Sequence, residues 1–225
     1  GSVQPVEKPL EILLVEDKEI NHKMVNSLLS KRGHTVDLAG SGLVALSAAS
    51  QKRYDIILMD VQMPDLDGFE AARQIRAAQG PNQQTPIIAM TAHVMPGDRQ
   101  RCLDAGMVDY ISKPIDTRKL FQILERWTGP ADEKDTAVLR FSKIAPPADA
   151  VLDIDGALTR FSGDREFYFN LLSEFLQDLP AKITEMKSAC AAGDLKTLAF
   201  HAHNLKGVAA NFGAAQLHSL VSRLD

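Results

Sequence analysis

Two side chains in this sequence can each carry a transferable phosphoryl group. Asp60 ends the apolar run 56–60, which has the composition of a buried strand. His203 lies within a stretch of helical periodicity, in the sequence His-Asn-Leu-Lys-Gly. An aspartyl carboxylate and a histidyl imidazole can both act as nucleophiles toward phosphorus. Finding both on one chain indicates a protein that passes phosphate along rather than one that consumes it.

Polar residues follow the apolar runs at the ends where an open parallel sheet binds its ligands. The first run ends in Glu16 and Asp17, the third in Asp60 and the fourth in Thr91, and Lys113 follows the fifth. If the first and third strands are neighbours, three carboxylates converge, and their mutual repulsion requires a cation. Carboxylate oxygens suit a small hard ion, so the pattern predicts a Mg²⁺ site.

Helix capping is the alternative explanation for the acidic residues, and for Asp17 alone it is equally good. Capping explains neither Thr91 nor Lys113, so the metal site is the stronger prediction for the whole set. Asp65 and Asp67 precede Gly68 and are assigned to turn and cap chemistry.

Two patterns alternate between residues 11 and 128, and together they predict a doubly wound five-stranded parallel sheet. The apolar runs are 12–15, 35–38, 56–59, 87–90 and 108–111. The segments with helical spacing are 20–32, 42–52, 68–79, 97–105 and 117–127.

Residues 129–150 break this rhythm with prolines and charged residues, which predicts a linker. Strand signals then vanish, and helical periodicity predicts an α-helical bundle from residue 151 onward. Its helices are expected at 165–192, 195–212 and 214–225, with Pro180 starting or kinking a helix. A bundle needs enough helices to cover its core. We therefore expect a further helix, missing at the C-terminus or supplied by another chain.

His203 lies off the apolar stripe of its predicted helix, roughly 100° from Ala202. The stripe consists of Leu195, Leu198, Ala202, Leu205 and Ala209. The flank around His203 holds Lys196, Ala199, Lys206, Gly207 and Ala210. Small neighbours leave the imidazole accessible, and lysines favour an incoming phosphoryl group. Gly207 costs about 1 kcal/mol inside a helix relative to alanine, so a steric reason for it is expected.

An ordinary surface histidine is the default interpretation of a lone histidine. Small and basic surroundings are unusual on a solvated face, which favours a functional role for His203. His201 falls near the opposite edge of the stripe and is predicted to be structural. His93 and His218 have no comparable context and are predicted to be surface or loop residues.

The stretches 12–17, 60–68, 90–93 and 112–114 resemble a two-component receiver domain spanning residues 10–128. The resemblance implies a flavodoxin-like fold in which Asp60 accepts phosphate. It implies that Glu16, Asp17 and the backbone carbonyl of Gln62 help Asp60 to hold Mg²⁺. Thr91 and Lys113 would contact the phosphoryl oxygens. Tyr110 matches a rotating aromatic residue of that family, although a half-buried strand tyrosine explains it equally well.

The run 203–214, with the segments 151–155 and 161–164, resembles a histidine-phosphotransfer domain covering residues 151–225. The resemblance implies a helical bundle that carries phosphate on an exposed histidine, here His203, without nucleotide or kinase activity. Lys206, one turn further on, is included in the predicted site. The abrupt end at Asp225 departs from the family and leaves the completeness of the bundle open.

Composition narrows the remaining function classes. The net charge of −4 argues against a general nucleic-acid binder. Cys102 and Cys190 lack metal-ligand spacing and fit a reducing cytoplasm. No apolar run approaches the roughly 20 residues of a membrane span, so no membrane contact is expected. The opening Gly1-Ser2 indicates an excised fragment, whose parent protein could carry a membrane anchor.

These features predict a phosphorelay similar to the C-terminal half of a hybrid sensor histidine kinase. Phosphate would pass from an upstream kinase domain, in the same full-length protein, to Asp60, then to His203 and a downstream response regulator. No glycine-rich nucleotide site is apparent, so no ATP-dependent autophosphorylation is expected, and whether the chain is an enzyme is left open. One alternative is a phosphate-independent scaffold. A dehalogenase-like phosphatase is a weak second one, because Gln62 stands where such enzymes have an acid. Whether Asp60 and His203 react within one molecule is also left open.

Overall fold

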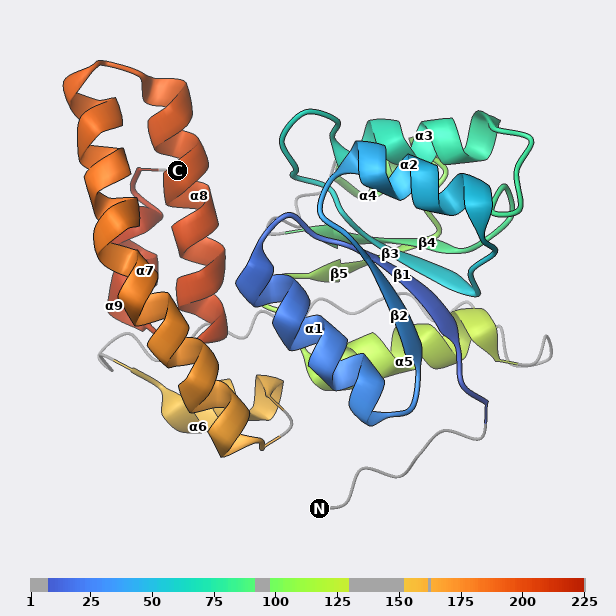
Figure 1. The fold of residues 1–225 in the computed structure, drawn as a ribbon, viewed down its shortest axis with the longest axis horizontal. Coiled ribbons are helices and arrows are strands. Elements are labelled where there is room, and N and C mark those ends of the chain that lie inside the picture. Colours follow the sequence, from blue (N-terminus) through green and yellow to red (C-terminus); the bar gives the residue numbers. More distant parts are fainter. Residues whose placement is uncertain (1–7, 92–97, 130–151, 162, 225) are drawn as a thin grey trace. The chain divides into compact units, whose positions relative to one another are not determined.

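Five strands form one parallel sheet in the order β2-β1-β3-β4-β5 (Figure 1). The strands are β1 (Glu11–Val15), β2 (Thr35–Ala39), β3 (Ile56–Asp60), β4 (Ile87–Thr91) and β5 (Asp109–Ser112). The doubly wound sheet is therefore confirmed. β1 and β3 are neighbours where the strand order reverses, which is where such sheets bind ligands.

This computed structural model describes residues 8–91, 98–129, 152–161 and 163–224. The chain separates into two compact units, Gly1–Ala137 and Val138–Asp225. The domain boundaries 10–128, 129–150 and 151–225 remain predictions, and most of the expected linker lies outside the described residues. Within the described ranges, no helix combines the length and apolar character that crossing a bilayer requires.

Helices cover both faces of the sheet, which explains why β3 and β4 are buried along their whole length. The helices α1 (Glu19–Lys31) and α5 (Thr117–Thr128) pack on one face (Figure 1). The opposite face carries α2 (Gly42–Gln51), α3 (Gly68–Ala77) and α4 (Asp98–Asp104). Strand residues such as Leu13 and Met59 form that second core with apolar side chains of these three helices.

The ends of the strands and the starts of the following helices determine which acids belong to the site. β3 ends at Asp60 and β4 at Thr91, the residues at which the sequence predicted these two strands to end. Asp17 does not cap α1, because the residue at the cap is Lys18 and no side chain closes that end. The capping explanation of Asp17 is therefore wrong. Asp67 does cap α3, where its carboxylate accepts from the Glu70 amide at 2.8 Å.

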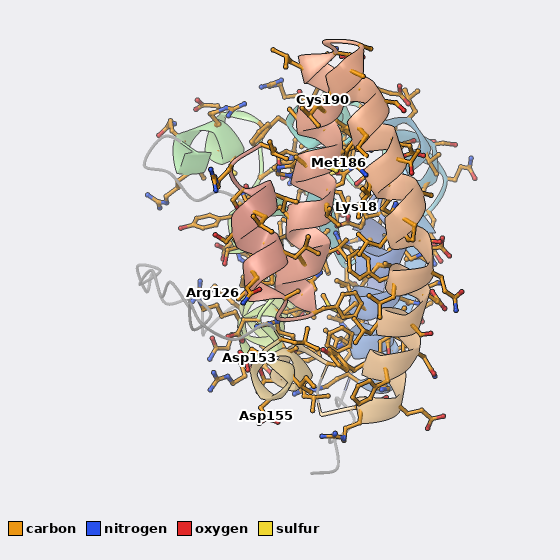
Figure 2. The ribbon with its side chains drawn as sticks, turned by 90° about the vertical axis from the view of Figure 1, so that its left-hand side faces the viewer. Lys18, Arg126, Asp153, Asp155, Met186 and Cys190 are labelled. Carbon is orange, nitrogen blue, oxygen red and sulfur yellow. The ribbon has the colours of Figure 1, made fainter. Side chains whose placement is uncertain are left out.

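Helices make up the described part of the second unit, which confirms its predicted class. They are α6 (Ile154–Arg160), α7 (Arg165–Ala191), α8 (Leu195–Asn211) and α9 (Ala215–Val221). The sequence did not predict α6, whose first turn is capped by Asp153 (Figure 2). Of the two expectations for Pro180, the helix start is wrong, because α7 runs through it as the periodicity of 165–192 predicted. Burial of Phe175 and Met186 on either side offsets the one lost backbone hydrogen bond.

An aromatic cluster fills the core of the second unit. Phe212 stacks on Phe161 and Phe175, with ring centroids 5.9 and 5.4 Å apart. The Tyr168 hydroxyl donates to the Phe212 carbonyl at 3.0 Å, so its one polar atom is satisfied. At the next residue, Gly213, a Cβ would lie only 2.3 Å from the Asp153 carbonyl. Glycine is required there, because the chain before α6 approaches the α8–α9 turn so closely.

Part of the predicted apolar stripe of α8 is wrong. Ala202, Leu205 and Ala209 are buried, whereas Leu195 is 73% exposed. Leu195 is the first residue of α8, at the end of the helix pair where little packs against it. The other exposed large apolar side chains described in this unit are Phe169, Leu176, Ile183, Phe200, Leu220 and Leu224. The expectation of a further helix stays a prediction.

Candidate functional site

Three carboxylates gather at the carboxyl edge of the sheet. Glu16 and Asp17 follow β1, and Asp60 ends β3. The register pairs Val15 with Met59, so Glu16 and Asp60 follow neighbouring positions. One ligand atom from each acid lies within 4.8 Å of the others. Glu16 is 1% exposed and Asp60 2% exposed, so water screens their repulsion poorly.

Lys113 places its ammonium between two of these acids. Its Nζ lies 2.6 Å from Oδ2 of Asp60 and 2.5 Å from Oε2 of Glu16. The side chain arrives from beyond β5, where the Lys113 amide donates to the Thr91 carbonyl at 2.7 Å. Burial alone would lower the pKa of Lys113, but its two carboxylate partners outweigh burial and raise it. Lys113 is therefore held as a cation.

Asp17 is the acid whose negative charge is least compensated by nearby hydrogen-bond donors and cations. Burial is the main cause that raises its pKa; the Lys18 charge opposes that rise and the Glu16 charge adds to it. Its buried Oδ1 accepts no hydrogen bond from the described residues. A buried carboxylate oxygen without a donor, within a cluster of three acids, fits a small hard cation. The residues present at this edge therefore suit Mg²⁺.

The loop after Asp60 wraps closely around the carboxylate. The Gln62 amide donates to Asp60 Oδ1 at 3.1 Å, and the Gly68 amide donates to the Val61 carbonyl. A Cβ at Gly68 would lie 2.1 Å from the Asp60 carbonyl, so only glycine fits without displacement. The backbone of Gln62 is thus held beside the acidic cluster.

Thr91 and Tyr110 occupy the strands beyond Asp60. Thr91 is buried at the end of β4, where it pairs with Ser112 in the register of the sheet. Tyr110 is half-buried on β5 and packs against the core under α4. Burial raises its pKa. Its placement agrees with the strand-tyrosine interpretation. Ala92 and His93, also part of the predicted motif, lie outside the described residues.

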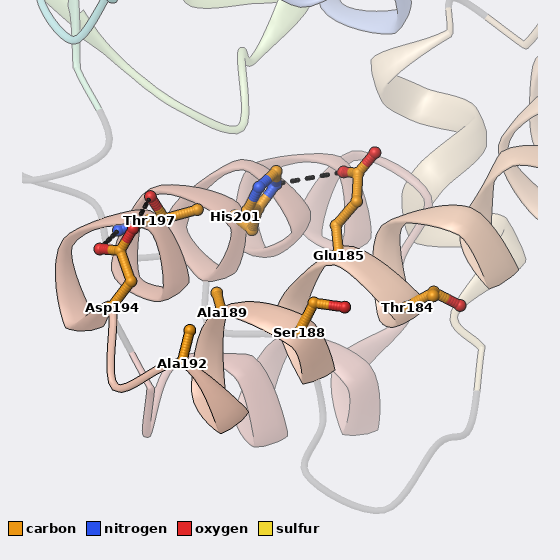
Figure 3. Close-up of a pocket in the computed structure, with 8 residues that line it drawn as sticks. All are labelled: Thr184, Glu185, Ser188, Ala189, Ala192, Asp194, Thr197 and His201. Atoms are coloured by element: carbon orange, nitrogen blue, oxygen red, sulfur yellow. Dashed lines mark hydrogen bonds and ion pairs between the residues drawn. The ribbon is translucent and has the colours of Figure 1, made fainter.

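The two histidines of α8 have different surroundings. His201 approaches α7, with its Nδ1 3.6 Å from Glu185 Oε2 (Figure 3). This contact lies in an open depression of about 450 Å³ between α7 and the start of α8. His203 is half-buried, as are Lys206 and Gly207 along the same flank, while Lys196 is exposed. A Cβ at Gly207 would meet nothing within 4 Å. Open space therefore adjoins His203 one turn further on.

His218 lies on α9, within the stretch where a helix was expected, and is half-buried. Burial lowers its pKa, and the positive charge of Lys206 lowers it further. α9 therefore brings a second imidazole near the basic flank of α8.

Comparisons with known sequences match both units. Residues 12–125 match the response regulator receiver domain family. The chain belongs to this receiver family. Residues 170–225 match the Hpt domain, the histidine-phosphotransfer family that the second unit resembles. Both expected resemblances are therefore confirmed.

The curated relatives are much longer sensor proteins. Sensor protein GacS of Pseudomonas syringae pv. syringae is 34% identical over 221 residues, covering 95% of this chain and 24% of that protein. Signal transduction histidine-protein kinase BarA of Escherichia coli (strain K12) is 32% identical over 218 residues, covering 96% of this chain and 24% of that protein. The receiver and Hpt units together thus span about a quarter of these relatives.

Two solved structures are similar to the receiver unit. The receiver domain of sensor histidine kinase PA1611 from Pseudomonas aeruginosa PAO1 is 45% identical, with a TM-score of 0.51, covering 55% of this chain and 100% of that chain. Magnesium is coordinated in the active site cleft of that structure. The second is the receiver domain of Ssk1, crystallised with the histidine phosphotransfer protein Ypd1 of Saccharomyces cerevisiae. It is 30% identical, with a TM-score of 0.52, and the match covers 57% of this chain and 97% of that chain.

Sequence reasoning missed two residues near the candidate sites. In the receiver unit, Asn21 is 3% exposed and its Nδ2 donates to Glu16 Oε1 at 2.9 Å. The signal was available, since Asn21 is a polar residue among the apolar positions Ile20, Met24 and Val25 of a helix. In the Hpt unit, Phe200 is 43% exposed. It lies three residues before His203, and residues three apart are neighbours on a helix surface.

Proposed function

We propose that this chain is a phosphorelay segment in which Asp60 receives a phosphoryl group and His203 receives it next. The observation that carries the proposal is the contact between Lys113 and Asp60 within the acidic cluster. A buried lysine held against one carboxylate, beside two further acids, provides both a nucleophile and charge neutralisation. The Hpt match of residues 170–225 adds the second acceptor.

Asp60 would act as the nucleophile in the first transfer. One carboxylate oxygen forms a bond to phosphorus as the bond from phosphorus to the donor's imidazole nitrogen breaks in line. The electron pair returns to that nitrogen. Lys113 and the Thr91 hydroxyl would bind the equatorial oxygens. Glu16, Asp17, Asp60 and the Gln62 carbonyl would hold Mg²⁺, which when bound neutralises phosphoryl charge.

His203 would receive the group in the second transfer. A neutral imidazole nitrogen forms a bond to phosphorus while the acyl phosphate bond to Asp60 breaks, which restores the carboxylate. The charge of Lys206 favours the incoming phosphoryl group, and the space beside Gly207 admits the donor. His203 would then donate to an aspartate of a separate response regulator.

The partners of this relay are part of the same proposal. The upstream donor would be a histidine kinase domain of the full-length protein, because the relatives that span this chain are sensor kinases. The segment itself would not phosphorylate itself from ATP. We place it in the cytoplasm, where reducing conditions suit its two free cysteines. Nothing favours the scaffold alternative, which leaves the charged cluster at Asp60 without a purpose.

A labelling experiment tests the first acceptor. The chain is incubated with Mg²⁺ and acetyl phosphate, and the mass of the intact protein is measured. We expect the gain of one phosphoryl group, labile to alkali, and no gain for Asp60→Asn. Asp65→Asn is the matched control, since Asp65 is exposed in the neighbouring loop. Equal labelling of the wild type and Asp60→Asn would contradict the proposal.

A further inference from the structure

The two carboxylate oxygens of Glu16 have separate partners. Oε1 accepts from Asn21 Nδ2 at 2.9 Å, and Oε2 contacts Lys113 Nζ. The Lys18 amide reaches the same Oε1 only at 3.4 Å, so Asn21 is its closer donor. Both Glu16 and Asn21 are almost completely buried. The amide of Asn21, on the first turn of α1, thus fixes which way the carboxylate is turned.

The type of residue at position 21 matters as much as the contact. Glutamate has one more rotatable bond than aspartate, so its carboxylate needs an additional contact to hold one orientation. A neutral amide provides a donor without adding charge. A lysine there would neutralise Glu16, and an aspartate would repel it. Asparagine therefore orients Glu16 while leaving its negative charge in the cluster.

We infer that Asn21 is a positioning residue for the metal site: it holds Glu16 through Oε1 so that Oε2 stays on the side of Asp60 and Lys113. The inference rests on the proposed function, because it concerns the same Mg²⁺ site. It adds a residue outside the predicted acid, threonine and lysine set. Asn21 acts through Glu16 and is not itself proposed to touch the metal or phosphate.

Calorimetric titration of the metal-free chain with Mg²⁺ tests this directly. Asn21→Leu keeps the branched shape of the side chain and removes the donor, and we expect its dissociation constant to rise about ten-fold. Asn26→Leu is the matched control on the same helix, where Asn26 accepts a hydrogen bond from Ser30 at 3.2 Å. The control should bind Mg²⁺ as the wild type does. Unchanged affinity in Asn21→Leu would overturn the inference.

A double-mutant cycle separates positioning from general support of the fold. Glu16→Asp withdraws the carboxylate by one methylene, and Asn21→Gln extends the amide by the same amount. We expect the double variant to bind Mg²⁺ more tightly than either single variant, which additive structural damage cannot produce. Additive losses would overturn the inference, and this arm does not depend on Asn21→Leu folding. A wild-type chain that neither binds Mg²⁺ nor labels at Asp60 would contradict the proposed function itself.

Discussion

Lys113 and Asp60 meet across the carboxyl edge of the sheet, with Nζ 2.6 Å from Oδ2. Their side chains are 10% and 2% exposed, so the contact is largely removed from water. Two of the three clustered acids contact this ammonium, and the third, Asp17, has Lys18 Nζ 3.9 Å from its Oδ1. The excess of negative charge explains why the site fits a metal ion and why removing any one charge should be felt by the others.

Replacing Lys113 should destabilise the receiver unit. Lys113→Gln leaves Glu16 and Asp60 buried without their cation, which typically costs about 3 to 5 kcal/mol. Urea unfolding in a chelating buffer measures the loss. Added Mg²⁺ should recover more stability in the variant than in the wild type. Arg118→Gln, at an 87% exposed side chain, is the control. A variant as stable as the wild type in chelator would contradict the account of the cluster.

The glycine at the turn beneath Asp60 should not tolerate a side chain. Gly68→Ala places a Cβ against the Asp60 carbonyl and displaces the loop that carries Gln62. We expect a loss of about 2 kcal/mol or more, together with slower labelling of Asp60. Gly80→Ala is the control, because a Cβ there meets nothing within 4 Å. Labelling at the wild-type rate in Gly68→Ala would show that the loop does not position the acceptor.

Gly207 offers a variant that separates stability from transfer. Because no neighbour lies within 4 Å of a Cβ there, Gly207→Ala should stabilise α8 by up to about 1 kcal/mol. If the space serves an incoming domain, the same change should slow phosphorylation of His203. Thermal unfolding and transfer rates from a phosphorylated donor measure the two effects. A more stable variant with an unchanged transfer rate would remove the steric explanation.

His34 should make the stability of the receiver unit depend on pH. Burial, with Arg32 nearby, lowers its pKa from the ordinary 6.5, and its Nδ1 accepts from the Leu10 amide at 3.2 Å. Above pH 6.5 both folded and unfolded chains hold it neutral. Below that pH the unfolded chain binds a proton before the folded chain does, so stability falls on acidification until the folded pKa is reached.

Urea unfolding at about pH 7.5 and about pH 5.5 checks this slope. His34→Gln should reduce the difference in unfolding free energy between these two pH values, while His22→Gln on α1 should leave that difference unchanged. An equal slope in the wild type and His34→Gln would assign the pH dependence to other groups.

The sequence predicted the parts of this protein that depend on local pattern. Apolar runs ending in Asp60 and Thr91 identified the strands, because buried parallel strands are continuously apolar. Helical periodicity predicted one helix over 165–192, and α7 does continue through Pro180, where burial of side chains on both sides offsets the proline. It also placed Leu195 in the core, although a helix end has fewer neighbours to cover a side chain.

The candidate site likewise has residues that local pattern predicts and residues that only the packing reveals. The acids and Lys113 could be named from their positions after strands, because topology brings strand ends together. Asn21 could not, because its role depends on a hydrogen bond to Glu16 that no spacing rule specifies. The difference between His201 and His203 was predictable from the helix projection, whereas the half-buried position of His218 depends on how α9 packs.

The most direct test follows a phosphoryl group from Asp60 to His203. The chain is labelled at Asp60 with acetyl phosphate and freed of donor, and the label is then classed over time by acid and alkali lability. The account predicts that alkali-labile label decays as acid-labile label appears, in the wild type and in His218→Gln but not in His203→Gln. Loss of label to water at the same rate in all three proteins, with no acid-labile species, would contradict the relay.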